Sequence, residues 1–391
     1  MNYEILHAQN KQELLHGRYI TLAQIEPLLF DLNKKNQLEK IGFSVLQKPI
    51  YKYQIGTGTT KILIWSQMHG NESTTTKALF DFMKLLNNET DFAKKILSEF
   101  RFCIIPMLNP DGAFSYTREN ANKVDLNRDF QNFSQPESIL LEKVFHDFKP
   151  DLCYNLHDQR TIFGAGNTNN PATVSFLSPS YNENRDYNTI RVNAIRVILN
   201  MNLVLQKYIP NQIGRFDDSF NNNCVGDHFQ SLGTTTILFE AGHYPNDYER
   251  EITRKYIFIA FVSSLTNVNE NDVVSKVIKE YLNIPQNKVI FYDFVYKNVK
   301  INYESTKKSI NFAAQYKEEL KDGKISFNSY VAKIDNLEGY YGHFELDCED
   351  LEYIDFDNNC PNLNDKANFK IGNKYEVVNG NVIALQKLTN K

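Results

Sequence analysis

Short apolar runs alternate with amphipathic helical patterns over the first 285 residues, and this alternation most constrains the fold. The runs are nearly continuous and rich in β-branched residues, which is typical of strands buried on both faces of a sheet. They lie at residues 61–67, 101–107, 151–156 and 234–239. Helical spacing of apolar residues recurs at Thr74–Leu86, Pro136–Phe148, Tyr187–Asn202 and Tyr248–Leu265. The pattern predicts an α/β fold, with a mixed, mostly parallel sheet and helices on both faces.

After residue 285 the pattern changes to short alternating stretches such as VIFYDFVYK and KISFNSYVAKI. Turn signals separate these stretches, for example Lys321-Asp322-Gly323 and Asn379-Gly380. We therefore expect a catalytic domain over residues 1–285 and a small, mostly β domain over residues 286–391. A length of 391 residues suits one large domain and one small one.

Charge and composition exclude several classes of partner. The net charge is −4, the isoelectric point is near 6.1 and no run of Lys or Arg occurs, so nucleic-acid binding is not expected. No apolar run reaches about 18 residues, so we predict no membrane span. The first 20 residues lack the apolar core of a secretory signal, and five cysteines make a poor disulfide framework. These features predict a cytoplasmic protein; they predict no oligomeric state.

A histidine and a glutamate directly follow the first of these strands, in Met68-His69-Gly70-Asn71-Glu72. Residues three apart face one side of a helix or meet in one tight turn, so His69 and Glu72 can reach one metal ion. Gly70 between them permits a turn that a side chain would hinder. The pair alone is a weak signal, because acidic residues are common at any spacing from a histidine.

A second histidine, His157, directly follows the strand at 151–156. A lone histidine there is more often structural than functional. The carboxyl ends of parallel strands meet at one edge of a sheet, however, so His157 would face the same cleft as His69 and Glu72. Two imidazoles and one carboxylate with an open position are typical of a catalytic zinc site.

A glutamate, Glu240, ends the strand at 234–239 within the sequence FEAGH. A carboxylate that ends an apolar strand is costly to bury unless it has a partner or a chemical role. Near a zinc-bound water it would be a general base and would then pass the proton to a leaving amine. The structural alternative is that Glu240 caps a helix beginning near Asn246.

Two arginines occur in the loops after the strand at 101–107. The turn signal NPDG at 109–112 comes first, and Arg118 and the sequence DLNR at 125–128 follow. A guanidinium matches a carboxylate with two hydrogen bonds, and a second one can stabilise a developing oxyanion. Charged loop residues are usually only solvated, so Arg118 and Arg128 gain meaning from the other motifs.

Together these motifs resemble the zinc carboxypeptidase family of the carboxypeptidase A type. The resemblance covers roughly residues 40–270 and includes the order and spacing of the motifs. It implies one zinc ion per chain, bound by His69, Glu72 and His157. It further implies Glu240 as the catalytic base, Arg118 as the residue that polarises the scissile carbonyl, Asn127 and Arg128 as the clamp for the terminal carboxylate of the substrate, and Asp125 as the carboxylate that orients His69.

The chain departs from that family in its substrate loop. Digestive carboxypeptidases carry a mobile Tyr about twenty residues before the catalytic Glu, whereas residues 214–221 here contain none. The loop is instead highly charged, and we interpret it either as a recognition loop or as an exposed polar turn. Asp227 lies where the family lines its specificity pocket, and an acid there favours a basic or amino-bearing substrate. Four other histidines are expected at the surface: His7, His16, His146 and His343.

Three functions remain open at this stage. The resemblance favours a zinc metallocarboxypeptidase, a hydrolase that cleaves an amide bond next to a free carboxylate of a peptide. The first alternative is an N-acyl amino acid deacylase, because aspartoacylase and succinylglutamate desuccinylase resemble the chain in their HGNE motif, an Asn-Arg clamp and a C-terminal β domain. The second alternative is an inert binding module with the same fold, which the unsubstituted ligand and base positions disfavour.

Overall fold

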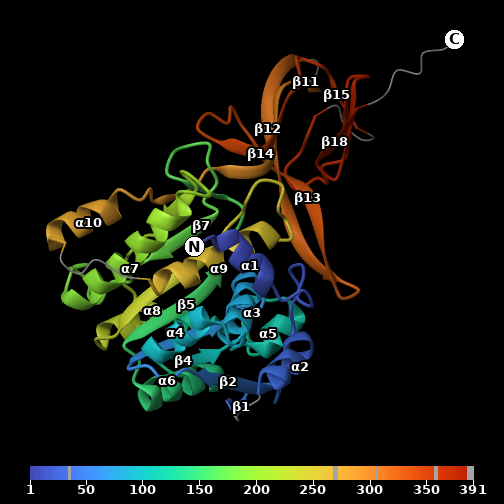
Figure 1. Cartoon of the computed structure of the whole chain (residues 1–391). Helices are drawn as coiled ribbons and strands as arrows, with labels where there is room; N and C mark the ends of the chain where they lie inside the picture. Colours follow the sequence, from blue (N-terminus) through green and yellow to red (C-terminus); the bar gives the residue numbers. More distant parts are fainter. Residues whose placement is uncertain (34–36, 267–271, 304–305, 356–359, 385–391) are drawn as a thin grey trace. The chain divides into compact units, whose positions relative to one another are not determined.

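The computed structural model describes residues 1–33, 37–266, 272–303, 306–355 and 360–384 (Figure 1). The chain divides into two compact units. The first unit holds Met1–Arg160 and Asn170–Asn287, and the second holds Thr161–Asn169 and Lys288–Lys391. The second unit therefore takes a nine-residue segment from the middle of the chain, which the sequence pattern did not suggest. The expected domains 1–285 and 286–391 stay a proposal.

An eight-stranded mixed sheet forms the centre of the first unit, in the order β1-β2-β4-β3-β5-β9-β7-β8. Neighbours run parallel from β4 through β3 and β5 to β9, and antiparallel pairs flank this parallel core. The strands are β1 Leu38–Phe43, β2 Pro49–Ile55, β3 Thr60–Ser66, β4 Phe100–Ile105, β5 Leu152–Asp158, β7 Val174–Leu177, β8 Ile213–Arg215 and β9 Thr235–Ala241.

Helices cover both faces of this sheet. They are α1 Tyr3–Asn10, α2 Leu22–Leu32, α3 Thr74–Leu86, α4 Asp91–Glu99, α5 Pro110–Ser115, α6 Pro136–Phe148, α7 Thr189–Leu205, α8 Val225–Ser231, α9 Glu251–Ser264 and α10 Val274–Leu282, with a 3₁₀ turn at Leu126–Arg128. Within the described residues, none of these helices has the length and apolar character that crossing a bilayer requires.

Two apolar layers show how the helices pack. Alternate residues of β3 and β5, such as Ile64 and Tyr154, join a core with α3, α7 and α9. The residues between them, such as Trp65 and Cys153, join a second core with α6 and α8 on the other face. Figure 1 shows the sheet between these helices. The α/β sheet with helices on both faces is therefore confirmed, as is the β-rich C-terminal region.

Local signals explain the helix limits. The helices α3 and α6 have the predicted bounds, and α6 begins with Pro136 at its first position, where the missing N–H is not needed. Helix α9 begins three residues later than predicted, because the Asp247 carboxylate accepts the N–H groups of Glu251, Ile252 and Thr253.

One predicted turn is instead the beginning of a helix. The sequence NPDG at 109–112 begins α5, where Asn109 is the N-cap and accepts the Gly112 N–H at 2.8 Å. Asn favours turns and helix N-caps for the same reason, since its side chain replaces a backbone acceptor. Whether NPDG forms a turn or begins a helix therefore depends on the residues that follow it.

The second unit consists of β-strands. One sheet has the order β13-β12-β11-β14, another has the order β15-β16-β17-β18, and β10 pairs with β6. The two four-stranded sheets share one apolar core, which includes Tyr296, Phe312 and Phe369. The strands are β6 Phe163–Ala165, β10 Asn287–Val289, β11 Phe291–Tyr303, β12 Thr306–Lys321, β13 Lys324–Ile334, β14 Tyr341–Asp347, β15 Tyr353–Ile354, β16 Phe369–Ile371, β17 Tyr375–Val378 and β18 Asn381–Ala384.

Candidate metal centre and active site

The His69–Glu72 segment forms a tight turn between β3 and α3. The Glu72 N–H donates to the His69 carbonyl at 3.1 Å, which brings both side chains to the same side of the turn. Gly70 is required by a close approach: a Cβ there would lie 1.9 Å from the backbone carbon of Gly112. Gln67, just before the turn, has a positive φ of 50°, which is rare for a residue with a side chain.

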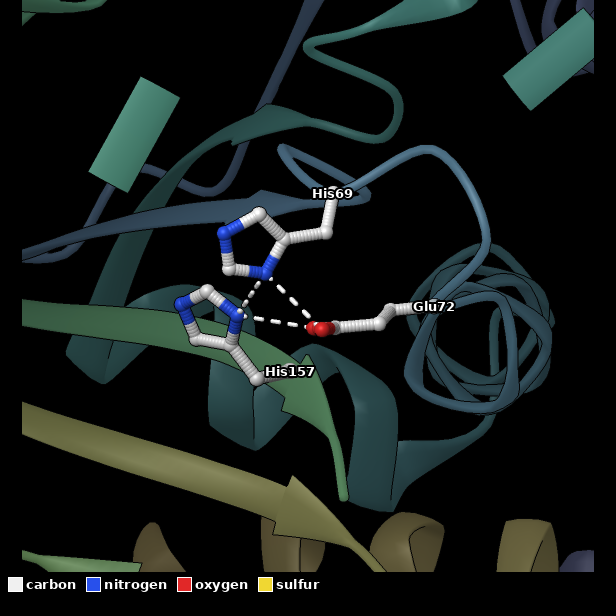
Figure 2. A group of neighbouring side chains, drawn as sticks. All are labelled: His69, Glu72 and His157. Carbon is white, nitrogen blue, oxygen red and sulfur yellow. Dashed lines mark hydrogen bonds and ion pairs between the residues drawn. The ribbon is translucent and has the colours of Figure 1, made fainter. Parts of the chain in front are cut away.

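Three buried side chains converge at the carboxyl edge of the parallel strands: His69, Glu72 and His157 (Figure 2). The Nδ1 atom of His69 lies 2.9 Å from one Glu72 oxygen, and the Nδ1 atom of His157 lies 2.8 Å from the other. The two Nδ1 atoms are 3.0 Å apart. Within the described residues, this is the one group of three His, Cys, Asp or Glu residues whose ligand atoms come this close together.

Asp125 sets the tautomer of His69. Its Oδ1 atom lies 2.9 Å from His69 Nε2, and an ionised carboxylate only accepts hydrogen bonds. The proton is therefore on Nε2, and the lone pair of Nδ1 points toward Glu72 and His157. The Asn127 N–H also donates to Asp125 Oδ1, at 2.9 Å. Burial opposes ionisation of Asp125, but His69 and Arg118 hold the pKa of this carboxyl well below its usual range.

Arg118 is the cation of this group. It donates to Glu72 Oε1 at 3.2 Å from Nη1 and to Asp125 Oδ2 at 3.1 Å from Nε. Its side chain is 42% exposed, whereas the carboxylates it contacts are largely buried. The guanidinium thus lies at the open side of the site, next to the groups that would hold a metal.

Glu240 lies beside His157 on the neighbouring strand. The two residues are paired in register between β5 and β9, so their side chains leave the same face of the sheet. The Oε2 atom of Glu240 is buried and has no hydrogen-bond partner within the described residues. Burial raises the pKa of Glu240 well above its usual value, and the charges of Glu72 and Asp158 raise it further. Glu240 does not cap α9, because Asp247 does.

The charges of the site are unbalanced in favour of anions. Four carboxylates, those of Glu72, Asp125, Asp158 and Glu240, lie near two guanidinium groups, those of Arg118 and Arg250. Buried carboxylates in such excess are unfavourable unless they bind protons or a cation. Two imidazole nitrogens and one carboxylate also form the donor set typical of catalytic zinc. The residues present therefore fit a divalent metal ion.

The proposed clamp residues lie at the N-terminus of α8. Asn127 Oδ1 accepts the Val225 N–H at 3.1 Å, so the 3₁₀ turn and α8 are joined. Arg128 is exposed, and its Nη1 donates to the Asn127 carbonyl at 2.7 Å. An exposed guanidinium beside a helix N-terminus attracts an anionic group.

Asp227 contacts the chain itself in this structure. It is 7% exposed, and its Oδ2 atom accepts the Asn221 N–H at 3.1 Å. Burial raises the pKa of Asp227 to about 7. Its carboxylate is therefore used to hold the loop before α8. The charges of that loop are also engaged, since Asp218 is bound to the buried guanidinium of Arg191.

Comparison with known proteins supports the resemblance to zinc carboxypeptidases. Residues 31–185 match the profile described as zinc carboxypeptidase, and this stretch includes His69, Glu72 and His157. Glu240 and Asp227 lie beyond the matched stretch, so their roles depend on the geometry above. The resemblance to this family is confirmed over the matched stretch.

Individual zinc carboxypeptidase relatives are distant. Carboxypeptidase 2 of Trichophyton rubrum is 27% identical over 100 residues, which is 25% of this chain and 19% of the relative. Carboxypeptidase E of Caenorhabditis elegans is 27% identical over 168 residues, or 36% of this chain and 34% of the relative. The chain thus matches about a fifth to a third of the length of these relatives.

A solved structure supports the fold. A metallo-carboxypeptidase from Burkholderia cenocepacia superposes with a TM-score of 0.50 and 17% identity. The superposition covers 62% of this chain and 68% of that one. At this identity the likeness concerns the fold alone.

Sequence reasoning did not assign a role to Asp158, although it is adjacent to His157. Its N–H donates to Glu72 Oε2 at 3.1 Å, and its carboxylate accepts the Thr74 and Thr75 N–H groups at 2.8 and 3.1 Å. Asp158 therefore caps α3 and holds Glu72 in this zinc carboxypeptidase-like site. The available signal was its position directly after a histidine at a strand end.

Proposed function

We propose that the chain is a zinc-dependent metallocarboxypeptidase, which hydrolyses a peptide bond next to the free carboxylate of a peptide. One observation carries the proposal. Both Nδ1 atoms and the Glu72 carboxylate meet within 3.0 Å. Glu240 is paired in register with His157, and its buried Oε2 atom has no hydrogen-bond partner among the residues that the structure describes. This arrangement combines a metal site and a base at one edge of the sheet.

The metal would be held by His69 Nδ1, His157 Nδ1 and the Glu72 carboxylate. Bound Zn²⁺ supplies a Lewis acid and lowers the pKa of water to roughly 7. Asp125 keeps the proton of His69 on Nε2, so that Nδ1 stays available. Arg118 remains at the open side of the site, where its guanidinium can donate to the oxygen of the scissile carbonyl.

Glu240 is the proposed base. Its raised pKa means that it takes up a proton readily, and a bound dication would oppose that rise and favour the ionised form. It accepts the proton of the attacking water and then donates it to the leaving amine. Glu240 is suited to both transfers because, in the part of the chain that the structure describes, no hydrogen bond to Oε2 must first be broken.

Asn127 and Arg128 are proposed to bind the terminal carboxylate of the substrate. The exposed guanidinium of Arg128 offers two parallel donors, and Asn127 attaches it to α8. Binding this carboxylate fixes the peptide, so that its last amide bond lies beside the metal. Asp227 stays a proposed contact for a basic or amino-bearing substrate group, and its Oδ2 atom also accepts the Asn221 N–H.

The experiment pairs metal binding with substrate choice. Purified chain is loaded with zinc and assayed on peptides with a free C-terminus, on the same peptides with an amidated C-terminus, and on N-acyl amino acids. We expect hydrolysis of the free peptides alone, and loss of zinc in His69→Ala. Preference for N-acyl amino acids would favour the deacylase instead. A wild-type chain that binds no zinc would contradict both enzymes.

A further inference from the structure

Arg250 is completely buried where the chain enters α9. Its φ of +59° lies in the left-handed region, which is strained for a residue with a side chain. The main chain is held there from both sides: its N–H donates to the Asp247 carbonyl, and its carbonyl accepts the Arg254 N–H, each at 3.0 Å. Such strain persists only where surrounding contacts determine the conformation.

The guanidinium of Arg250 joins the ends of two strands. One nitrogen, Nη1, donates to the Ala241 carbonyl at 2.6 Å and to the Gly242 carbonyl. The other, Nη2, donates to the Gln159 carbonyl at 2.9 Å. Ala241 and Gly242 directly follow Glu240, and Gln159 is two residues after His157. The planar fork of one arginine therefore holds the strand ends that carry the proposed base and a proposed metal ligand.

Packing leaves little space around these carbonyls. A Cβ on Gly242 would lie 2.0 Å from the Ala172 carbonyl oxygen and 2.3 Å from Gln159 Nε2. Thr253 Oγ1 donates to the Gly242 carbonyl at 3.1 Å, and the Gln159 N–H donates to the Ala241 carbonyl at 2.9 Å. The strand ends thus behave as one rigid piece, with the guanidinium at its centre.

We propose that Arg250 is a positioning residue, which fixes Glu240 relative to His157 by holding the ends of β9 and β5 together. The inference rests on the proposed function, since it concerns Glu240 as the base. Arg250 does not touch the substrate. A displacement of about 1 Å in a catalytic group lowers the rate by about 100-fold. We therefore expect Arg250 to affect kcat rather than substrate affinity.

Arg254 provides a matched control. It lies one turn further along α9, is equally buried, and donates to Asp81 at 2.6 and 2.7 Å instead of to the strand ends. Loss of either guanidinium lowers stability. Only loss of Arg250 releases the carbonyls beside Glu240.

The first measurement separates kcat from KM in zinc-loaded protein, well below each variant's unfolding temperature. For Arg250→Gln we expect kcat to fall about 10- to 100-fold, with KM within about threefold of wild type. Arg250→Lys keeps the charge and reaches some of the carbonyls, so it should recover at least part of the loss. Arg254→Gln should keep the wild-type kcat. A kcat of Arg250→Gln within twofold of wild type, or an equal fall in Arg254→Gln, would overturn the proposal.

The second measurement needs no activity. Hydrogen exchange of the zinc-free protein reports the amides of Gln159 and Gly242, which bond across the strand ends. We expect exchange at least about tenfold faster in Arg250→Gln than in wild type or Arg254→Gln. Unchanged exchange would overturn the positioning role. Faster exchange in a chain whose wild type binds zinc but hydrolyses nothing would instead contradict the proposed function alone.

Discussion

Two buried groups of charges in the first unit differ in their balance. The metal-site group surrounds His69 and His157, and its four carboxylates lie near only two guanidinium groups, those of Arg118 and Arg250. The α3–α9 group contains two acids, Asp81 and Glu251, and two cations, Lys77 and Arg254, together with His7. Lys77 lies 2.5 Å from Glu251, and Arg254 lies 2.6 Å from Asp81.

The difference separates a structural group from a functional one. In the α3–α9 group every charge has an opposite partner, so burial is compensated within the chain. Arg254 also donates to the Leu15 and Gln12 carbonyls, which fastens the N-terminal segment to α9. In the metal-site group the compensation must come from protons or from a bound dication. Burial alone therefore does not distinguish a functional group of charges from a structural one, whereas the balance of positive and negative charge does.

The largest effect is expected when the base is removed from the unbalanced group. Glu240→Gln should lower kcat by about 10²- to 10⁴-fold, which is the usual contribution of general acid–base catalysis. Zinc content should be unchanged, and the unfolding temperature should not fall, because a buried carboxylate without a partner at Oε2 is removed. Steady-state kinetics measures kcat, metal analysis measures the zinc content, and thermal unfolding measures the unfolding temperature.

Glu251→Gln is the matched control, since this half-buried glutamate belongs to the balanced group. It should lower the unfolding temperature and keep the kcat of folded protein. Equal losses of kcat in the two variants would show that the distinction between the groups is wrong.

The next effect concerns the stability of the balanced group. Asp81→Ala leaves the buried Arg254 without its carboxylate, and it should lower the free energy of unfolding by about 3–5 kcal/mol. Urea titration followed by a signal from the first unit measures this change. Activity per folded molecule should stay at the wild-type level. A loss under about 1 kcal/mol would indicate that Arg254 finds other partners.

Metal should stabilise the unbalanced group specifically. Free zinc at 100 times its dissociation constant should raise the free energy of unfolding by about 2.7 kcal/mol, because only the folded chain presents the three ligands together. His157→Ala should lose this gain, and Asp81→Ala should keep it. Thermal unfolding with and without a chelator tests the prediction, and a gain that persists in His157→Ala would place the metal elsewhere.

The smallest effect is a pH dependence at Asp227. Burial raises the pKa of Asp227 from 3.8 to about 7 in the folded chain, so folding takes up a proton between about pH 4 and 7. Its contribution to stability therefore falls as pH rises through that range. Relative to wild type, Asp227→Asn should gain stability over the same range and show no further gain above pH 7.

Asp217, in the same loop, is the comparison for that experiment. The Ser219 hydroxyl lowers its pKa, so its contribution to stability is lost only as pH falls below about 4. Asp217→Asn should thus show its pH dependence in acid alone. Equal profiles for the two variants would contradict the assignment to burial.

Periodicity and caps predicted much of the first unit. The apolar runs became β3, β4, β5 and β9, because a strand buried on both faces must be apolar throughout. The outer strands on the two sides of the sheet, β1 with β2 and β7 with β8, were not predicted. They are short or only partly buried, and such strands have no distinctive pattern.

Histidine roles show the limit of local patterns. His7 was expected at the surface, but it is 5% exposed and contacts Asp81 at 3.1 Å. This prediction was wrong because the partner lies 74 residues away, and no spacing near His7 records it. The contacts of Arg250 could not be predicted for a similar reason. Its partners are backbone carbonyls, and every residue has one, so no sequence pattern marks them.

The chemistry of the site was readable from residue types, because metal binding needs His and Glu at a spacing set by one turn and at the ends of strands. Residue order also predicted which strands share an edge, since parallel pairing follows from the helices between them. Three other features depend on residues that are distant in the chain. They are the balance of charge in the site, the burial of Asp227, and the hydrogen bonds of Arg250 to the strand ends. They arise because a polar group that is removed from water needs a hydrogen-bond or charge partner, and the tertiary structure decides which groups lie close enough.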